Sequence, residues 1–335
     1  MNKLQKLKNQ LSSIYKKEII FNLSPASGYR SRCEFGYKNG SYTMVKDGKK
    51  VFLEHFDLPV SAIQNIMEPL LEAINTNPLI NKKLFQINFR AVNQIVLVTL
   101  IYHKQLDQDW LESARIIETK LDINVLGRSK NQLLATHLTE LEQYIDINPS
   151  YYLYQNDKTF YQPNAFLMPK MVKLVISLIE NPRDLLELYC GSGTFTIPLS
   201  YSFKNVFATE NNRESISYLK KSIHKNHIKN IFYARLSDIE LMDAYKGRIF
   251  RRLENIDLKN FNFSHVLVDP PRSGLSHNVT EILNKFENII YISCNPDTFK
   301  RDLDKLKDYR IKKLEVFDQF SNTPHLELIA LLIKR

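Results

Sequence analysis

The chain has 335 residues, of which 44% are hydrophobic and 24% are charged, and its formal net charge is +10 at pH 7. This length suits two domains, and no apolar run approaches the ~20 residues of a membrane helix, which excludes a membrane-spanning protein. Three cysteines without paired spacing exclude a disulfide framework and predict a cytoplasmic location. The positive net charge favours a polyanionic partner over the alternative of an ordinary lysine-rich surface.

The first half of the chain predicts a basic helix followed by an α+β domain. Residues 1–20 have the pattern of an amphipathic, lysine-rich helix and lack the apolar core of a signal peptide. Strand-like runs follow, with turns predicted at Asn39-Gly40 and Asp47-Gly48, then a helix over 61–77 and two strands over 85–103. We expect residues 1–155 to form one domain and residues 156–335 to form another.

After about residue 155 the pattern changes to strands that alternate with helices. Buried parallel strands separated by helices form a doubly wound sheet, so this half predicts a Rossmann-like α/β domain. Two closing strands, 313–320 and 325–334, are separated by only four residues, which suits an antiparallel pair at the sheet end. The predicted parallel strands are 185–189, 205–210, 230–236, 264–270 and 288–294.

A glycine-rich turn follows the first of these strands in ELYCGSGTF, residues 187–195. Gly191 and Gly193 allow close approach of a ligand, but Thr196 stands where a dinucleotide site has its third glycine. Glu210 ends the next strand, 19 residues after Gly191, where a carboxylate can accept both hydroxyls of a ribose. This combination suits S-adenosylmethionine better than NAD; the alternative is a structural glycine turn with a capping glutamate.

The motif DPPRSGL places Asp269 at the carboxyl end of the fourth strand, the edge at which open α/β sheets bind ligands. Two prolines fix the direction of the chain there. Asp269 could accept N–H groups of a base or of the cofactor, and Arg272 could bind a carbonyl or a phosphate. The alternative is a Pro-Pro turn with a surface arginine.

Cys294 ends the fifth strand and therefore opens onto the same edge. Asn295 can cap the following helix and Pro296 suits its first position, and a helix N-terminus favours a thiolate. These features indicate a nucleophile, although buried core cysteines are as common.

A nucleophile beside a methyl donor suits chemistry at carbon 5 of uracil. Thiolate addition at carbon 6 makes carbon 5 reactive, and a base must later remove the proton from carbon 5. Glu327 is the candidate base: it shares one strand face with His325, and apolar neighbours would raise its pKa. The alternative is a solvated strand residue.

The motifs together resemble the class I S-adenosylmethionine-dependent RNA uracil-C5 methyltransferases. The resemblance covers at least residues 160–335, and YRSRCEF near the start is similar to that family's substrate domain. It implies an N-terminal RNA-recognition domain, a class I methyltransferase domain with a seven-stranded sheet whose last strand is antiparallel, Cys294 as nucleophile and Glu327 as proton acceptor. It also implies that Gln162 and Asp269 face the uracil. The matching motifs are YQPN (161–164), ELYCGSGTF, DPPRSGL, YISCNP and HLE. The implied cofactor residues are Gln162, Tyr189, Thr194, Glu210 and Asp269.

The resemblance is greatest to the tRNA branch of this family, whose members make 5-methyluridine at position 54 of the T-loop and also modify tmRNA. Members that act on ribosomal RNA typically carry four cysteines for an iron–sulfur cluster, and Cys33, Cys190 and Cys294 cannot supply that set. We expect no metal, no membrane partner and no obligate protein partner. Thr194 departs from the family, which commonly has Asn at this position.

RNA contacts are predicted from basic and aromatic residues. Arg30 and Arg32 would alternate on one strand face and contact the loop, and Arg272 would bind the substrate. Phe85, Phe89 and Tyr102 are candidates for base stacking, although core packing is the alternative. Further phosphate candidates are Lys46, Lys49, Lys50, Arg248 to Arg252, Lys300 and Arg301.

Three other functions remain open. An RNA cytosine-C5 methyltransferase usually has a cysteine in the fourth-strand motif, where this chain has Asp-Pro-Pro-Arg. An amino methyltransferase has an aromatic residue at Arg272 and needs no thiol. An RNA-folding protein with a relic cofactor fold would not need Cys294 or Glu327.

Overall fold

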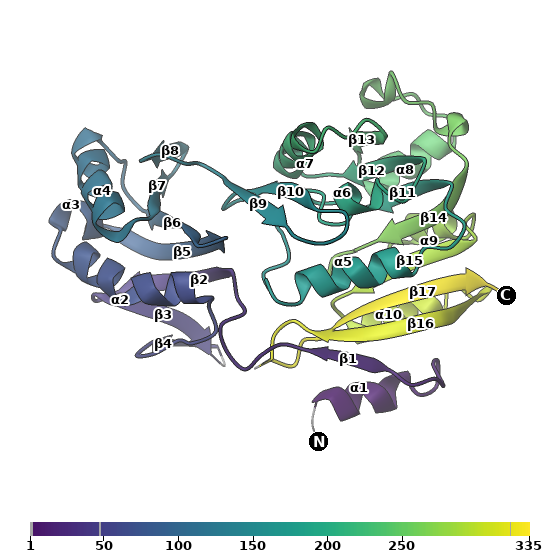
Figure 1. Ribbon diagram of the computed structural model, residues 1–335, viewed down its shortest axis with the longest axis horizontal. Helices are drawn as coiled ribbons and strands as arrows, with labels where there is room; N and C mark the ends of the chain where they lie inside the picture. Colours follow the sequence, from purple (N-terminus) through teal and green to yellow (C-terminus); the bar gives the residue numbers. More distant parts are fainter. Residues whose placement is uncertain (1–2, 47, 322) are drawn as a thin grey trace.

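The computed structural model describes residues 3–46, 48–321 and 323–335. The chain forms two sheet-based bodies side by side, with the hairpin of β9 (Leu141–Ile145) and β10 (Tyr151–Gln155) between them (Figure 1). The turn predicted at Asp47-Gly48 includes Asp47, which lies outside the described residues. Within those residues, no helix is long and apolar enough to span a bilayer.

The first body is an α+β domain, as predicted. Its strands are ordered β4-β3-β2-β5-β6-β7-β8, and among these neighbours only β6 and β7 are parallel. Ile63, Leu70 and Trp110 bury the apolar faces of two helices against this sheet. Its strands are β2 (Arg32–Lys38), β3 (Ser41–Lys46), β4 (Lys49–Phe52), β5 (Leu84–Val92), β6 (Ile95–Tyr102), β7 (Asn124–Ser129) and β8 (Gln132–Ala135), and its helices are α2 (Ser61–Asn75), α3 (Pro78–Asn81) and α4 (Gln108–Leu121).

The second body is a doubly wound sheet, ordered β1-β16-β17-β15-β14-β11-β12-β13 in the described chain. Neighbouring strands are parallel except at β17, which is antiparallel to both β15 and β16. All predicted strands form, but β17 lies inside the sheet and not at its end. The strands are β1 (Ile20–Leu23), β11 (Asp184–Leu188), β12 (Asn205–Glu210), β13 (Ile231–Arg235), β14 (Phe263–Val268), β15 (Asn288–Ser293), β16 (Tyr309–Asp318) and β17 (Glu327–Lys334).

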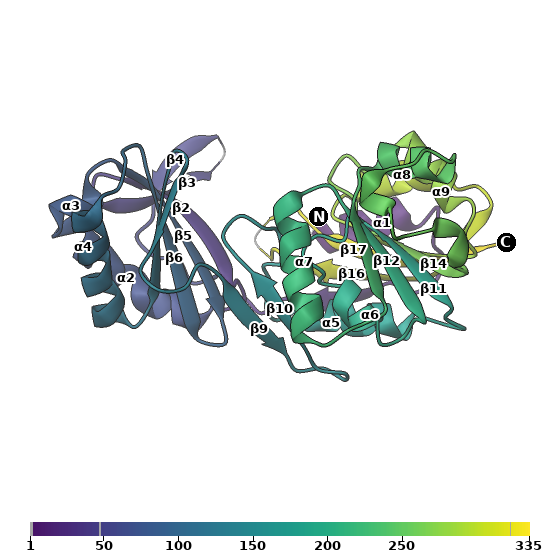
Figure 2. The ribbon, with the colours of Figure 1, turned by 90° about the horizontal axis from the view of Figure 1, so that it is seen from above.

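Helices cover both faces of the second sheet (Figure 2). One face packs against α5, α6 and α7, and the other against α1, α8, α9 and α10. The carboxyl ends of β11, β14 and β15 therefore meet at one exposed edge, where ligands bind in such sheets. The helices are α1 (Lys3–Leu11), α5 (Met168–Ser177), α6 (Thr196–Leu199), α7 (Arg213–Lys225), α8 (Asp238–Tyr245), α9 (His277–Leu283) and α10 (Pro296–Leu303).

The start of the chain belongs to the second sheet, which corrects two expectations. β1 adds an eighth strand to the seven predicted, because Ile20 to Leu23 pair in parallel with β16. The helix expected in the first domain, α1, packs Leu7 and Leu11 into the core of the second body. The domain boundary near residue 155 stays a prediction, but the segment before β2 extends back to the sheet of the second body (Figure 1).

Candidate active site

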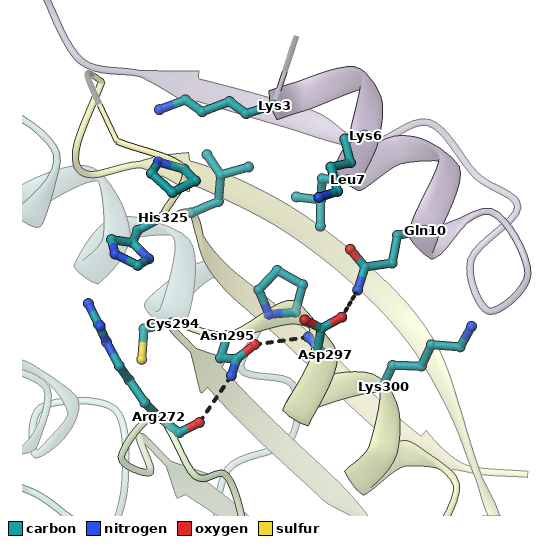
Figure 3. A pocket seen from close by; sticks show the side chains of 13 residues that line it. Lys3, Lys6, Leu7, Gln10, Arg272, Cys294, Asn295, Asp297, Lys300 and His325 are labelled. Atoms are coloured by element: carbon teal, nitrogen blue, oxygen red, sulfur yellow. Dashed lines mark hydrogen bonds between the residues drawn. The ribbon is translucent and has the colours of Figure 1, made fainter. Parts of the chain in front are cut away.

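Cys294 lies between a buried strand and a helix. It follows β15 and precedes α10, whose cap is Asn295; the Asn295 side chain accepts a hydrogen bond from the backbone N–H of Asp297 at 3.1 Å, and Pro296 is the first helical residue, as predicted. The side chain of Cys294 is partly exposed and lines a cavity of about 650 Å³ (Figure 3). The alternative of a sealed core thiol is therefore excluded.

The electrostatic environment of the thiol differs from the prediction. Burial raises the pKa of Cys294 above its ordinary value of 9.0, and the charges of Glu327 and Asp269 raise it further, whereas Arg272 lowers it. A helix N-terminus acts only within its first turn, and the effect of burial outweighs it here. The expectation that the site lowers the pKa of Cys294 and stabilises a thiolate in the free protein is therefore wrong.

Glu327 is a buried carboxyl group at the start of β17, with 7% of its surface exposed. Gln162 donates a hydrogen bond from Nε2 to Glu327 Oε1 at 3.4 Å. Burial raises the pKa of Glu327 from 4.5 to about 7, and the Gln162 hydrogen bond opposes this rise. The alternative of a solvated strand residue is thus excluded. His325 does not share its environment, because His325 precedes the strand and is exposed at the cavity.

Asp269 directly follows β14 and completes a cluster of acidic groups. Burial raises its pKa well above 3.8, and the neighbouring carboxylates of Glu327 and Glu187 add to this effect. The structure therefore brings Cys294, Asp269 and Glu327 within electrostatic reach of one another, from the ends of three neighbouring strands.

Glu187 is a site residue that the sequence analysis missed. It lies in β11 with 1% of its surface exposed, and its Oε2 atom has no hydrogen-bond partner among the described residues. Burial raises its pKa to about 8. The signal was present as one acidic residue within the apolar run LLELY, because a carboxyl group is almost never buried without a functional or structural partner.

The turn after β11 fits the predicted cofactor. Gly191 has φ +56°, and a Cβ atom built there would meet no atom within 4 Å, so ligand space adjoins the backbone. The Glu210 carboxylate accepts hydrogen bonds from the backbone N–H groups of Gly191 at 3.0 Å and Asn212 at 2.7 Å. Glu210 thus supports the glycine turn, as expected of a capping glutamate, and its carboxylate has further lone pairs that can accept hydrogen bonds from ribose hydroxyls.

The other predicted cofactor residues lie around the same edge. Gln162 and Thr194 line one small cavity with Ser192, whose buried hydroxyl has no partner in the described chain. Tyr189 directly follows β11, with φ +60°, and is partly exposed. An excess of carboxyl groups with unpaired polar atoms suits a ligand that carries a sulfonium, an amino group and hydroxyls. The residues present therefore fit S-adenosylmethionine, and no three His, Cys, Asp or Glu side chains of the described ranges form a metal-binding group.

The predicted RNA-contacting arginines do not share one strand. β2 begins at Arg32, which pairs with Glu34, whereas Arg30 precedes the strand and makes an isolated bridge. The guanidinium of Arg30 lies 5.5 Å from the centre of the Phe320 ring. The alternation predicted for these two residues is therefore wrong, although both lie near the junction between the two bodies.

The remaining basic candidates divide into paired and unpaired groups. Arg248 pairs with Asp243 at 2.8 Å, and Arg301 with Asp302 at 2.7 Å, so neither is free for phosphate. Lys300 lines the cavity of Cys294 together with the exposed Arg272. The remaining candidates do not line this cavity. Arg252 pairs with Glu240, and exposed lysines lie on β3 and β4, namely Lys46, Lys49 and Lys50.

The aromatic candidates mostly belong to the core. Phe89 and Tyr102 are buried, at 1% and 3% exposure, which supports the packing alternative. Phe85 is partly exposed and stacks on His103 with ring centres 3.9 Å apart.

The comparisons with known proteins agree on one family. The family profile described as tRNA (Uracil-5-)-methyltransferase matches residues 1–335. A tRNA/tmRNA (uracil-C(5))-methyltransferase of Campylobacter concisus (strain 13826) is 42% identical over 97% of this chain and 91% of its own length, and one of Saccharophagus degradans is 39% identical over 98% and 93%. Pyrococcus abyssi tRNA (uracil-54, C5)-methyltransferase, solved with S-adenosyl-L-homocysteine, has the same fold with a TM-score of 0.77 at 23% identity, over 99% of this chain and 83% of that chain. With its profile match and these relatives, the chain belongs to the tRNA (uracil-5-)-methyltransferase family.

Proposed function

We propose that this protein methylates carbon 5 of uridine 54 in the T-loop of tRNA, and of the equivalent uridine in tmRNA, in the cytoplasm. Family membership supports the uracil-C5 reaction. The names of the relatives include both tRNA and tmRNA, and that of the Pyrococcus abyssi protein includes position 54. The observation that carries the proposal is the Cys294 thiol, open to a cavity and within reach of two buried carboxyl groups.

In the proposed reaction Cys294 is the nucleophile. The thiol loses its proton to water in the open cavity, and its sulfur adds to carbon 6 of uracil, which turns the ring into an enolate. S-adenosylmethionine, when bound, would supply an electrophilic methyl group, whose bond to the sulfonium sulfur would break as carbon 5 attacks and leave the neutral thioether S-adenosylhomocysteine. The raised pKa of Asp269 favours its protonated form, which can donate a hydrogen bond to the enolate oxygen.

Glu327 completes the reaction as a general base. Carbon 5 holds both the new methyl group and its original proton, and the product is aromatic only after that proton leaves. The Glu327 carboxylate takes the proton, the carbon–sulfur bond breaks, and the thiolate of Cys294 is restored. A base with a pKa of about 7 suits this step near neutral pH, and Gln162 holds the carboxylate in place.

An unmodified tRNA transcript and radiolabelled cofactor test the assignment directly. Label should appear as 5-methyluridine, and a transcript with cytidine at position 54 should receive none. Cys294→Ala should abolish transfer, whereas Cys33→Ala, which alters a buried cysteine of the first body, should retain it. Label in cytosine would favour an RNA cytosine-C5 methyltransferase, and label in ribosomal RNA alone would favour a methyltransferase that acts on ribosomal RNA. Full activity of Cys294→Ala would exclude the covalent mechanism.

A further inference from the structure

The N-terminal helix α1 forms one wall of the cavity at Cys294. Its apolar residues Leu7 and Leu11 are buried in the core of the second body, at 3% and 0% exposure. Lys3, Lys6 and Gln10 lie at helical spacings of three and four residues, so they share one side of the helix, and all three line the cavity (Figure 3). A segment far from the catalytic motifs in sequence thus faces the proposed nucleophile.

Two polar anchors hold this wall in place. The Lys3 ammonium donates to Asp318 Oδ1 at 2.6 Å and to the backbone carbonyls of Phe320, Ser321 and Thr323 at 3.0, 2.9 and 2.9 Å. At the other end of the helix, Gln10 Nε2 donates to Asp297 Oδ1 at 2.5 Å. These contacts tie α1 to the β16–β17 connection and to α10, which form the adjoining walls.

Three cations at this cavity have no acidic partner in the part of the chain that the structure describes. They are Lys6 of α1, Lys300 of α10 and Arg272 of the segment after β14. Other basic residues that were candidates for phosphate binding, such as Arg248 and Arg301, are neutralised by ion pairs. Three unpaired cations from separate elements therefore line the cavity onto which Cys294 opens.

A uridine extruded from an RNA loop brings its two flanking phosphates to the mouth of the cavity that receives the base. Lysine and arginine side chains bind phosphates by charge-assisted hydrogen bonds, and the resulting affinity depends steeply on salt. We propose that α1 is part of the RNA-binding site, where Lys6, with Lys300 and Arg272, binds the backbone phosphates that flank the uridine delivered to Cys294. This proposal rests on the proposed function.

The test compares two lysines of the same helix. Lys6 and Lys8 are both exposed, but Lys6 lines the cavity and Lys8 does not. Binding of a fluorescent, unmodified T-arm hairpin is measured by anisotropy between about 50 and 200 mM salt for Lys6→Ala and Lys8→Ala. Lys6→Ala should weaken binding about 5- to 10-fold and reduce the slope of log affinity against log salt by about one, as loss of one phosphate contact predicts. Lys8→Ala should change neither quantity.

The proposal would be overturned if Lys6→Ala bound RNA as tightly as the wild-type protein, or if both variants lost affinity equally, because neither result depends on the cavity. Lys300→Ala provides a second measurement on another element, and it should also lower the salt slope by about one. The binding readout does not depend on methyl transfer. If the wild-type protein fails to methylate tRNA while Lys6→Ala alone weakens RNA binding, the proposed reaction fails and the RNA site stands.

Discussion

Replacement of Glu327 by glutamine should stabilise the RNA-free protein at pH 8 while it slows the reaction. The carboxyl group is 7% exposed, and its pKa is raised by burial to about 7. Glutamine keeps an oxygen that can accept the hydrogen bond from Gln162, and it has nearly the same volume. The substitution therefore removes the buried charge with little change in packing.

The size of the expected gain in stability follows from the difference between the pKa of Glu327 in the folded protein, about 7, and its ordinary pKa of 4.5. Because one pKa unit corresponds to about 1.4 kcal/mol, the ionised carboxylate destabilises the fold by up to about 3 kcal/mol. The folded state holds this proton more tightly, so the contribution of protonated Glu327 to stability is fully present below about pH 4.5 and is lost as the pH rises through about 7. Glu327→Gln should show no advantage at pH 4.5 and its full advantage at pH 8.

Denaturant unfolding of both proteins at pH 5, 6.5 and 8 measures this advantage. Glu315→Gln is the matched control, because Glu315 lies on the neighbouring strand β16 but pairs with Lys313 at 3.1 Å, so its loss should not stabilise the protein. If Glu327→Gln is no more stable than wild type at pH 8, or is equally stabilised at pH 5, the buried-charge argument is refuted.

Within the proposed mechanism the same variant should be a poor catalyst. Removal of the proton from carbon 5 would be slow, and a covalent protein–RNA adduct should accumulate on a denaturing gel. Because the pKa of Glu327 is about 7, its ionised fraction increases between pH 6 and pH 8, so the rate of product release should rise over this range if that step limits turnover.

Three further substitutions test other parts of the structure. Gly193→Ala should destabilise the protein by about 1–3 kcal/mol in denaturant unfolding, because Gly193 has φ +96° and a Cβ atom would lie 2.6 Å from a leucine side chain. Arg90→Met should cost about 2 kcal/mol and loosen the junction of the two bodies, measurable by limited proteolysis, because the buried guanidinium lies 4.3 Å from the Tyr161 ring centre and donates to two oxygens beyond residue 150. Lys3→Met should lower the melting temperature by a few degrees and lower kcat, because it releases Asp318 and the connection that leads into β17.

The sequence predicted the catalytic sheet because its signals are local. Each parallel strand is an apolar run that ends in a turn motif, and parallel strands place their carboxyl ends at one edge. The sequence did not predict β1, because Ile20 to Leu23 is too short a run and its pairing with β16 joins residues nearly 300 positions apart. The pattern of α1 shows that one face is buried, but it cannot show which sheet covers that face.

The electrostatics of the site could not be read from the sequence for a related reason. A helix start after Cys294 is a local feature, and it favours a thiolate. Burial is the largest effect that opposes it, and the smaller effects come from Glu327 and Asp269, which are distant in the chain and meet only through strand order. Glu187 and Arg90 each stand in an apolar run, a local signal that the sequence analysis did not use, and the fold shows that both are buried.

The raised pKa values have a consequence for when the nucleophile forms. In the free protein burial raises the pKa of both the Cys294 thiol and the Asp269 carboxyl group, and each acid that ionises makes the next ionisation harder. The proposed addition to uracil places negative charge on the ring oxygen while the sulfur becomes neutral in a carbon–sulfur bond. A protonated Asp269 can donate to that oxygen, whereas an ionised one would repel it. The acidic cluster thus disfavours a free thiolate and favours the adduct, so the thiol should react with solution alkylating agents more slowly than an exposed cysteine until a pyrimidine is present to accept the sulfur.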